Sequence, residues 1–379
     1  MKIVFVSNFL NHHQLSFCSA IKERCEGFSF IATENVTNIG YQRATEEDYV
    51  LHYYNYEEKE KAEKAIIEAD AVIFGACPNE LIEKRMKLDK LSFLFSERFF
   101  KKGVWRRFMP STRKTIINRI ARYKDQNMYI LCASAYLPYD LSFFDYPKKK
   151  YLKWGYFPQL KIYSNVQKII EEKKERSFLW AGRLIDWKHS EQALILAKQL
   201  VKSNYNFTLN IVGDGPLKRK LEKLIKKFKL QDHVKLLGSL SSDKVREQME
   251  KAAIFLFTSN RKEGWGAVLN EAMNSGCAVV ASHAIGSVPF LIEDKQNGLI
   301  YQDGNSKDLF KKVKWLLDNP EQCKKLGKTA YQVMIDQWNA DNAAERLCSL
   351  TKELKHNHSS FYQDGICSKA DIIKDNWNR

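Results

Sequence analysis

Four charged side chains in the second half of the sequence have types and spacings that suit a phosphorylated, hydroxyl-rich ligand. Glu263 and Glu271 stand eight positions apart in KEGWGAVLNEAMNSG, and Arg183 and Lys188 lie together in AGRLIDWKH. Ionised carboxylates only accept hydrogen bonds, so they suit vicinal hydroxyl groups. Arginine offers a fork and lysine a point charge to phosphate oxygens, so the cations suit a diphosphate. The alternatives are solvated loop charges for the cations and a helix-surface acid for Glu271.

Glycine-rich turns accompany these charges. The sequence places Gly182 before Arg183, a GDGP turn with Gly213, Gly215 and Pro216, and the run Gly264, Trp265, Gly266 and Ala267 after Glu263. Amides of Gly264 to Ala267 would open a helix that carries Glu271 and direct its positive end at the same anion. Plain turn chemistry is the alternative reason for the glycines.

Alternating apolar strands and helical patterns must position these residues. The pattern predicts strands at 2–7, 28–32, 71–76, 91–96, 128–134, 177–182, 207–213, 233–239, 253–259 and 277–282. Fully apolar strands separated by helices indicate parallel sheets covered on both faces. Ligands bind beyond the carboxyl ends of such strands, where the glycines and charges fall.

The number of strands favours an α/β chain of two doubly wound, Rossmann-like domains. We place an N-terminal domain at 1–165, a second domain at 166–345 and a helix end and tail at 346–379, with the linker around 156–176. A terminal helix is predicted over 338–354. The polar tail after Lys355 is expected to be loosely held.

The bulk composition limits the class of protein. The 379 residues are 44% hydrophobic and 28% charged, which is an ordinary globular balance. No apolar run approaches the roughly 18 to 20 residues that span a bilayer, and the start lacks the pattern of a signal peptide. The eight cysteines form no C-x-x-C pair and no cluster with zinc spacing, so we expect reduced thiols, no metal and a cytoplasmic protein.

The charge is strongly basic and unevenly spread. The chain has 61 basic and 45 acidic residues, a net charge of +16, which favours anionic partners. Residues 98–124 contain ten Lys or Arg and no acid, and Ile116, Ile117 and Ile120 recur there at helical spacing after Pro110. This pattern is typical of a basic amphipathic helix. It either packs on its own domain or anchors the protein peripherally on anionic lipid.

The motifs AGRL with Lys188, GDGP and EGWGAVLNEAMNSG, in that order, resemble the donor half of retaining glycosyltransferase family 4, which has the GT-B fold. The resemblance covers about residues 177–345 and implies a donor cleft between two domains. It implies that Arg183 and Lys188 hold the diphosphate of a nucleotide sugar, Glu263 contacts the transferred sugar and Glu271 the ribose. The residues from Gly213 to Pro216 would then lie near the nucleotide. Gly182 and the run Gly264, Trp265, Gly266 and Ala267 would also bind the donor.

The N-terminal half matches the family less closely. Many members have a glycine pair after the first strand, where this chain has NFLNHHQ (8–14). That variant and LFSERF (94–99) resemble a subset acting on cell-surface polysaccharides. His12 and His13 would replace the missing diphosphate contact, bind the acceptor or serve a structural role. Glu97 and Arg98 are further candidates on the acceptor side.

The resemblance implies retaining, metal-independent hexosyl transfer. The cosubstrate would be a uridine diphosphate sugar ahead of guanosine diphosphate mannose, with no cofactor. The acceptor would be a glycan or lipid-linked glycan at the inner face of the cell membrane.

Three alternatives stay open. A dinucleotide-dependent oxidoreductase lacks its G-x-G-x-x-G after the first strand. A basic nucleic-acid-binding protein is suggested by the charge, but no nucleic-acid module is visible. A GT-B protein without activity is the third.

Overall fold

A computed structural model describes residues 1–36, 47–356 and 361–378. The chain forms two compact units, Met1–Gln159 with Trp338–Lys374, and Leu160–Gln337 with Asp375–Arg379. Each unit has a parallel sheet of its own, so the predicted pair of doubly wound domains is confirmed. Among the described residues, no helix is long and apolar enough to cross a membrane.

The first unit is built on a seven-stranded parallel sheet in the order β3-β2-β1-β4-β5-β6-β7. Its central strands have almost no exposed side chains, because apolar residues fill Ile3–Val6 and Ala71–Phe74, as expected for a parallel sheet covered on both faces. The strands are β1 Lys2–Ser7, β2 Gly27–Ala32, β3 Val50–His52, β4 Ala71–Phe74, β5 Ser92–Ser96, β6 Met128–Cys132 and β7 Tyr151–Lys153.

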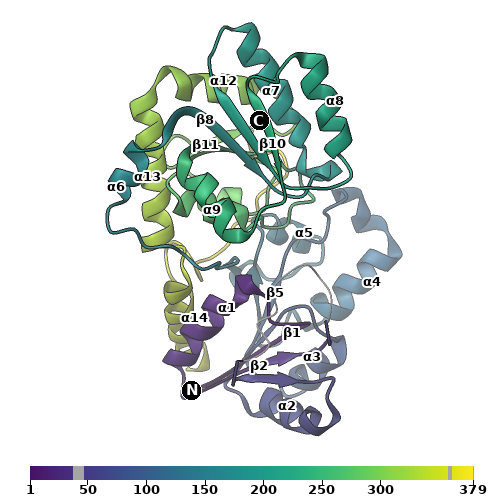
Figure 1. Ribbon diagram of the computed structural model, residues 1–379. Coiled ribbons are helices and arrows are strands. Elements are labelled where there is room, and N and C mark those ends of the chain that lie inside the picture. Colours follow the sequence, from purple (N-terminus) through teal and green to yellow (C-terminus); the bar gives the residue numbers. More distant parts are fainter. Residues whose placement is uncertain (37–46, 357–360, 379) are drawn as a thin grey trace. The chain divides into compact units, whose positions relative to one another are not determined.

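The helices of the first unit include the C-terminal helix of the chain. They are α1 His12–Arg24, α2 Tyr56–Glu68, α3 Asn79–Met86, η1 Val104–Phe108, α4 Pro110–Arg119, η2 Ala121–Tyr123, α5 Leu137–Ser142, η3 Lys148–Lys150 and α14 Ala340–Lys355. Helix α14 lies beside α1, as Figure 1 shows, and Arg24 on α1 pairs with Asp341 on α14 at 2.8 Å.

The second unit has a six-stranded parallel sheet in the order β10-β9-β8-β11-β12-β13. The strands are β8 Lys174–Ala181, β9 Thr208–Val212, β10 Val234–Gly238, β11 Ala252–Phe257, β12 Ala278–Ser282 and β13 Leu299–Tyr301. The helices are α6 Val166–Glu171, η4 Asp186–Lys188, α7 Ser190–Lys202, α8 Lys218–Phe228, α9 Ser242–Lys251, α10 Val268–Asn274, α11 Val288–Leu291, α12 Ser306–Asp318 and α13 Pro320–Asp336.

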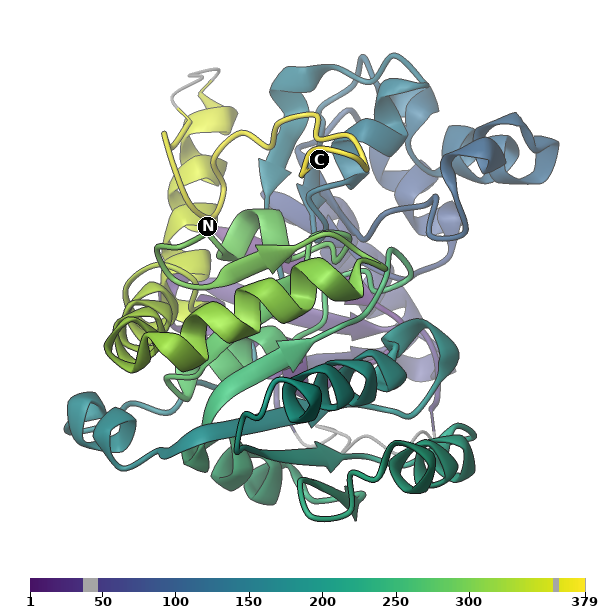
Figure 2. The same cartoon turned by 90° about the horizontal axis from the view of Figure 1, so that it is seen from above.

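The helices of the second unit form two groups. Helix α7 contacts α8 and α12, whereas α10 contacts α9 and α13. Helices α7, α8 and α12 pack with β8 and β9 around a continuous apolar core. This core includes Phe178, Trp180 and Leu209. Figure 2 shows helices on both sides of these strands. The carboxyl ends of the strands therefore stay the accessible edge of the sheet.

The tail differs from the expectation that it is loosely held. Ile366, Cys367 and Ser368 are buried, and the Lys153 amide on β7 donates to the Ser368 carbonyl at 2.8 Å. Strand β7 is the edge of its sheet, and an edge strand offers backbone groups that a passing segment can pair with. The unit boundary also differs from the one expected at residue 345, because α14 packs on α1 rather than ending the second domain.

Candidate functional site

The predicted cation and carboxylate at the edge of the second sheet contact each other. Lys188 follows β8 and Glu263 follows β11, and their side chains form an ion pair that leaves 15% and 13% of their areas exposed. Strands β8 and β11 are parallel neighbours, so their carboxyl ends bring the two loops side by side. The site therefore holds a largely desolvated pair of opposite charges.

Backbone and side-chain hydrogen bonds join these two loops. The Trp180 indole donates to the Thr258 hydroxyl at 2.8 Å, and that hydroxyl donates to the Lys188 carbonyl at 2.8 Å. The backbone amide of Asn260 donates to the backbone carbonyl of Trp187 at 2.9 Å. The position of Lys188 is therefore fixed by the strand that leads to Glu263.

Arg183 lies at the same edge, directly after β8 and Gly182, and is exposed. In the described part of the chain, its guanidinium has no hydrogen bond or ion pair. An unpaired guanidinium at the same sheet edge as a largely desolvated charge pair is available to an anionic ligand.

Glu271 lies on α10, and its carboxylate has no hydrogen-bond donor among the described residues. Burial raises the pKa of this carboxyl, and the charge of Arg246 opposes that effect. A partly buried acceptor without a donor is costly to keep, and such groups cluster at ligand sites. The geometry suits a ligand that donates from hydroxyl groups.

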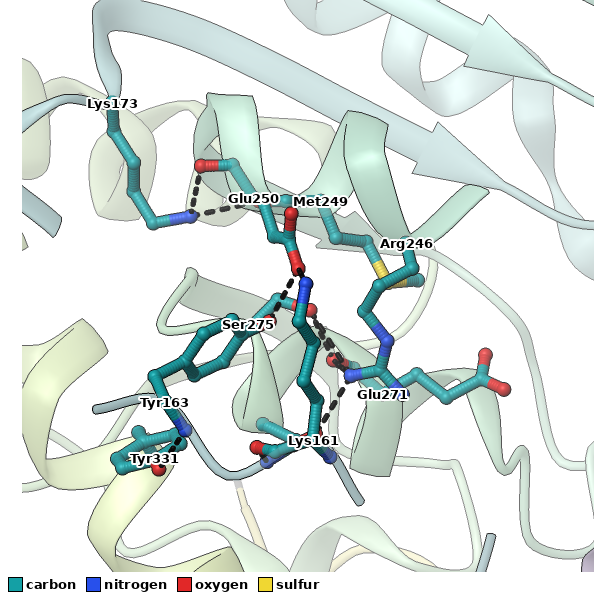
Figure 3. A network of polar contacts seen from close by, with 10 residues as sticks. Lys161, Tyr163, Lys173, Arg246, Met249, Glu250, Glu271, Ser275 and Tyr331 are labelled. Atoms are coloured by element: carbon teal, nitrogen blue, oxygen red, sulfur yellow. Dashed lines mark hydrogen bonds and ion pairs between the residues drawn. The ribbon is translucent and has the colours of Figure 1, made fainter. Parts of the chain in front are cut away.

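Arg246 is a residue that the sequence analysis missed. From α9 it donates to the Glu271 carbonyl at 3.1 Å, to Asn274 Oδ1 at 2.8 Å and to Ser275 Oγ at 3.2 Å. Figure 3 shows its guanidinium at the backbone of Glu271, whose carboxylate extends away from it. Arg246 thus fixes the helix that carries Glu271. No local motif marks it, because its partners lie 25 or more positions along the chain.

Lys161 and Tyr163 belong to the same network in Figure 3. Lys161 Nζ and Tyr163 Oη each contact Glu250 Oε1 at 2.7 Å. The Lys161 backbone also exchanges two hydrogen bonds with the Asn274 side chain. The first residues of the second unit are therefore bound to α9 and α10.

Trp265 requires a correction, since we expected it to contact the donor. Its side chain is 1% exposed, and its indole donates to Asn270 Oδ1 at 2.9 Å. The apolar ring is buried beneath the loop instead of facing a ligand, and the Trp265 carbonyl accepts from Ser287 Oγ at 2.6 Å. Trp265 therefore anchors the loop that carries Glu263.

The glycines of the GDGP turn have a packing role. Gly213 has φ +133°, and a Cβ there would overlap the Gly182 carbonyl. At Gly215, with φ +151°, a Cβ would lie 2.6 Å from the Leu184 carbonyl. The loops after β8 and β9 thus touch backbone to backbone. Pro216, Gly264, Gly266 and Ala267 lie in the same set of loops, and Ala267 is the N-cap of α10.

His12 and His13 are the first two residues of α1. Asn11 caps this helix, accepting from the His13 amide at 3.0 Å. Burial and the charge of His12 lower the pKa of His13 to about 4, and burial also lowers the pKa of His12. His13 is therefore neutral near pH 7, so a contact between it and a diphosphate would be a hydrogen bond and not an ion pair.

Arg98 also requires a correction as an acceptor-side candidate. It is 3% exposed and pairs with the fully buried Asp140 at 3.0 Å. Its guanidinium lies 4.9 Å from the centre of the Tyr136 ring. Arg98 is thus part of the core of the first unit. Glu97 is more exposed and pairs with Lys101.

A hollow of about 780 Å³ opens at the carboxyl ends of β1, β4 and β5 in the first unit. Its lining includes Asn8, Asn11, Gln14, Glu97 and Arg119. Arg119 comes from α4, where it donates to the Cys77 carbonyl at 2.9 Å and to Asn79 Oδ1 at 2.8 Å. Polar groups of both kinds therefore converge on this hollow.

A protein-family model matches most of the second unit. Residues 163–333 match the family model described as glycosyl transferases group 1. An uncharacterized glycosyltransferase of Methanocaldococcus jannaschii is 34% identical over 169 residues, 44% of this chain and 46% of that protein. The alpha-D-kanosaminyltransferase of Streptomyces kanamyceticus is 27% identical over 46% of this chain and 45% of its own length. The chain thus spans about half the length of these curated relatives.

Solved structures extend the likeness to the whole fold. The crystal structure of Anabaena Alr3699/HepE in complex with UDP has a TM-score of 0.70 and 15% identity, covering 93% of this chain and all of that one. A sucrose-phosphate synthase from Thermosynechococcus elongatus has a TM-score of 0.64 and 15% identity, covering 94% of this chain and all of that one. Residues 163–333 therefore correspond to a glycosyl transferases group 1 region, within a chain that has the GT-B fold.

Proposed function

We propose that the protein is a retaining glycosyltransferase that transfers a hexose or N-acetylhexosamine from a uridine diphosphate sugar to a cell-surface glycan or its lipid-linked precursor. The observation that carries the proposal is the Glu271 carboxylate, which is partly buried and has no donor in the described part of the chain, on the same unit as the Lys188–Glu263 pair. Support comes from the match to glycosyl transferases group 1. A relative named poly(ribitol-phosphate) alpha-N-acetylglucosaminyltransferase, from Staphylococcus aureus, supports the class of acceptor.

In the proposed reaction, the bond from the anomeric carbon to the diphosphate breaks and a bond to the acceptor oxygen forms on the same face. The acceptor proton passes to an oxygen of the departing diphosphate. Negative charge grows on that diphosphate, and Arg183 and Lys188 stabilise it. Removal of one donor of this kind typically costs about 3 to 4 kcal/mol of transition-state stabilisation.

In this proposal, Lys188 binds the diphosphate while it stays paired with Glu263. An ammonium group has three N–H donors, so one can stay on the carboxylate while others reach phosphate oxygens. Glu263 would keep its second oxygen for sugar hydroxyls, and Glu271 would accept from the ribose diol. The protein cations take the part of a metal ion, so the proposal includes no metal.

The first unit would bind the acceptor in the hollow that Asn8, Glu97 and Arg119 line. Helix α4 lies beside it, and Trp105 and Phe108 before that helix are 60% and 70% exposed. Exposed aromatic rings among cations fit the surface of an anionic bilayer. Ile116 and Ile120 pack inside the unit, so the helix does not offer its whole apolar side. We therefore propose peripheral attachment at the inner face of the cell membrane through the exposed residues of 98–124, Trp105 and Phe108 above all.

Vesicle flotation tests the membrane part. Vesicles with anionic lipid should bind the protein, and 0.5 M salt should release it, because salt screens the attraction. The Trp105→Ser, Phe108→Ser variant should bind less. Equal binding to neutral and anionic vesicles would contradict an electrostatic anchor.

A thermal-shift panel of UDP, UDP-glucose, UDP-N-acetylglucosamine and GDP-mannose tests the donor. A ligand at about 100 times its dissociation constant adds roughly 2.7 kcal/mol of stability. Stabilisation by uridine nucleotides alone would support the proposal. Stabilisation by GDP-mannose alone would change the base, and stabilisation by none would refute the donor site.

A further inference from the structure

His189 directly follows Lys188 and has an unusual backbone. Its φ of +48° lies in the left-handed region, where a residue with a side chain costs roughly 1 to 2 kcal/mol. It ends η4 and caps the start of α7. Such residues persist when their surroundings hold them, and they cluster at functional sites.

Two hydrogen bonds hold the His189 ring. Nδ1 lies 3.0 Å from Glu191 Oε1, and Nε2 lies 2.9 Å from Asn260 Nδ2. A carboxylate only accepts and an amide nitrogen only donates. The ring is therefore the neutral tautomer that donates from Nδ1 and accepts at Nε2.

The orientation of the Asn260 side chain is fixed from the other side. Asn260 Oδ1 accepts from the Lys262 amide at 3.0 Å. If His189 became protonated, Nε2 would be a donor facing another donor. Turning the Asn260 amide would satisfy the ring but leave the Lys262 amide facing an N–H group. Protonation thus breaks one of these two hydrogen bonds. Because both involve the Asn260 side chain, either loss weakens the hold on the Lys262 amide.

We propose that neutral His189 is a positioning residue for the donor site, since through Asn260 it holds the loop that presents Glu263 to Lys188. The backbone carbonyl of Asn260 also accepts a hydrogen bond from the Glu263 backbone amide at 2.9 Å. The inference rests on the proposed function for its consequence in catalysis. The hydrogen-bond chain itself can be tested without any ligand.

Three acids govern the protonation of His189. The hydrogen bond to Glu191 raises its pKa above the ordinary 6.5, ahead of burial, which lowers it, and of Asp303 and Asp186, which raise it. Asp303 in turn faces His283 and Arg261. A raised pKa means that the ring gains its proton at a higher pH than an ordinary histidine does, so it is more protonated at pH 6 than at pH 8.

Hydrogen exchange of the ligand-free protein tests the chain of contacts. Corrected for intrinsic rates, protection of the Lys262 amide in the wild type should fall roughly threefold to tenfold from pH 8 to pH 6, which is the loss of one ordinary hydrogen bond. His189→Gln keeps an acceptor without titrating, so it should remove this dependence. His189→Asn, which tolerates the left-handed backbone, is the second variant. His233→Gln should leave the dependence unchanged.

Binding of UDP-glucose at the same two pH values tests the link to the donor. Both of its phosphates are esterified, so the ligand itself does not titrate in this range. The wild type should bind roughly threefold to tenfold more weakly at pH 6, and His189→Gln should bind equally at both. Equal pH dependence in both proteins, or unchanged Lys262 protection in the wild type, would overturn the inference. If protection of the Lys262 amide depends on pH but UDP-glucose does not bind at all, the donor proposal is refuted and the contact between His189 and Asn260 still stands.

Discussion

Replacement of Lys188 by methionine tests whether the charge pair at the edge of the second sheet is as desolvated as its geometry indicates. The change keeps the length of the side chain and removes its charge, so Glu263 is left as a carboxylate without its cation. A fully buried pair that loses one partner costs about 3 to 5 kcal/mol. Because the two side chains stay 15% and 13% exposed, we expect a loss of about 2 to 4 kcal/mol.

A double-mutant cycle combines Lys188→Met with Glu263→Gln. The second change removes the charge that Lys188→Met leaves uncompensated. The double variant should therefore lose less stability than the two single losses added together, by about 1 kcal/mol or more. Native-state hydrogen exchange of β11 reports the stability of the second unit separately from the first. Lys244→Met, an exposed lysine on α9, serves as the matched control. A loss for Lys188→Met within about 0.5 kcal/mol of the control would refute the reasoning.

Three further outcomes follow from the geometry. Gly213→Ala should destabilise the second unit in a denaturant titration by about 1 to 3 kcal/mol more than Gly304→Ala, because both glycines have positive φ but only at Gly213 would the added Cβ meet another backbone. Glu271→Gln should raise stability at neutral pH and lose this advantage in acid. The sign follows because burial raises the pKa of the folded carboxyl, so wild-type stability falls as pH rises through that pKa; a constant difference across pH would contradict it. Arg98→Met should lower the stability of the first unit by about 3 to 5 kcal/mol in the same assay, since it leaves Asp140 buried, whereas unchanged stability with altered acceptor use would restore Arg98 as a binding residue.

The long buried strands could be predicted from sequence because an apolar run of five or more residues leaves few other options. The three strands that were missed, Val50–His52, Tyr151–Lys153 and Leu299–Tyr301, each have three residues and lie at an edge of a sheet. So short a run carries too little pattern to be told from a loop. Their pairing depends on the neighbouring strand rather than on their own residues.

The candidate site likewise has residues whose placement could be predicted from the sequence and residues whose placement could not. The prediction placed Lys188 and Glu263 at one sheet edge because parallel strands present their carboxyl ends together, and the ion pair is there. The side-chain directions of Trp265 and Arg98 depend on tertiary packing, and no local pattern indicated that either would be buried. Arg246 was missed for the same reason.

Calorimetric titration of UDP into the wild type, Glu271→Ala and Glu247→Ala tests the central claim most directly. Glu247 is an exposed acid on α9 and matches the change in charge. Hydrogen bonds to a charged group contribute about 1.5 to 3 kcal/mol, so Glu271→Ala should weaken UDP binding by roughly tenfold to 150-fold, while Glu247→Ala binds as the wild type does. Equal affinity in all three proteins would contradict the assignment of Glu271 to the ribose, and absence of binding by the wild type would contradict the donor site as a whole.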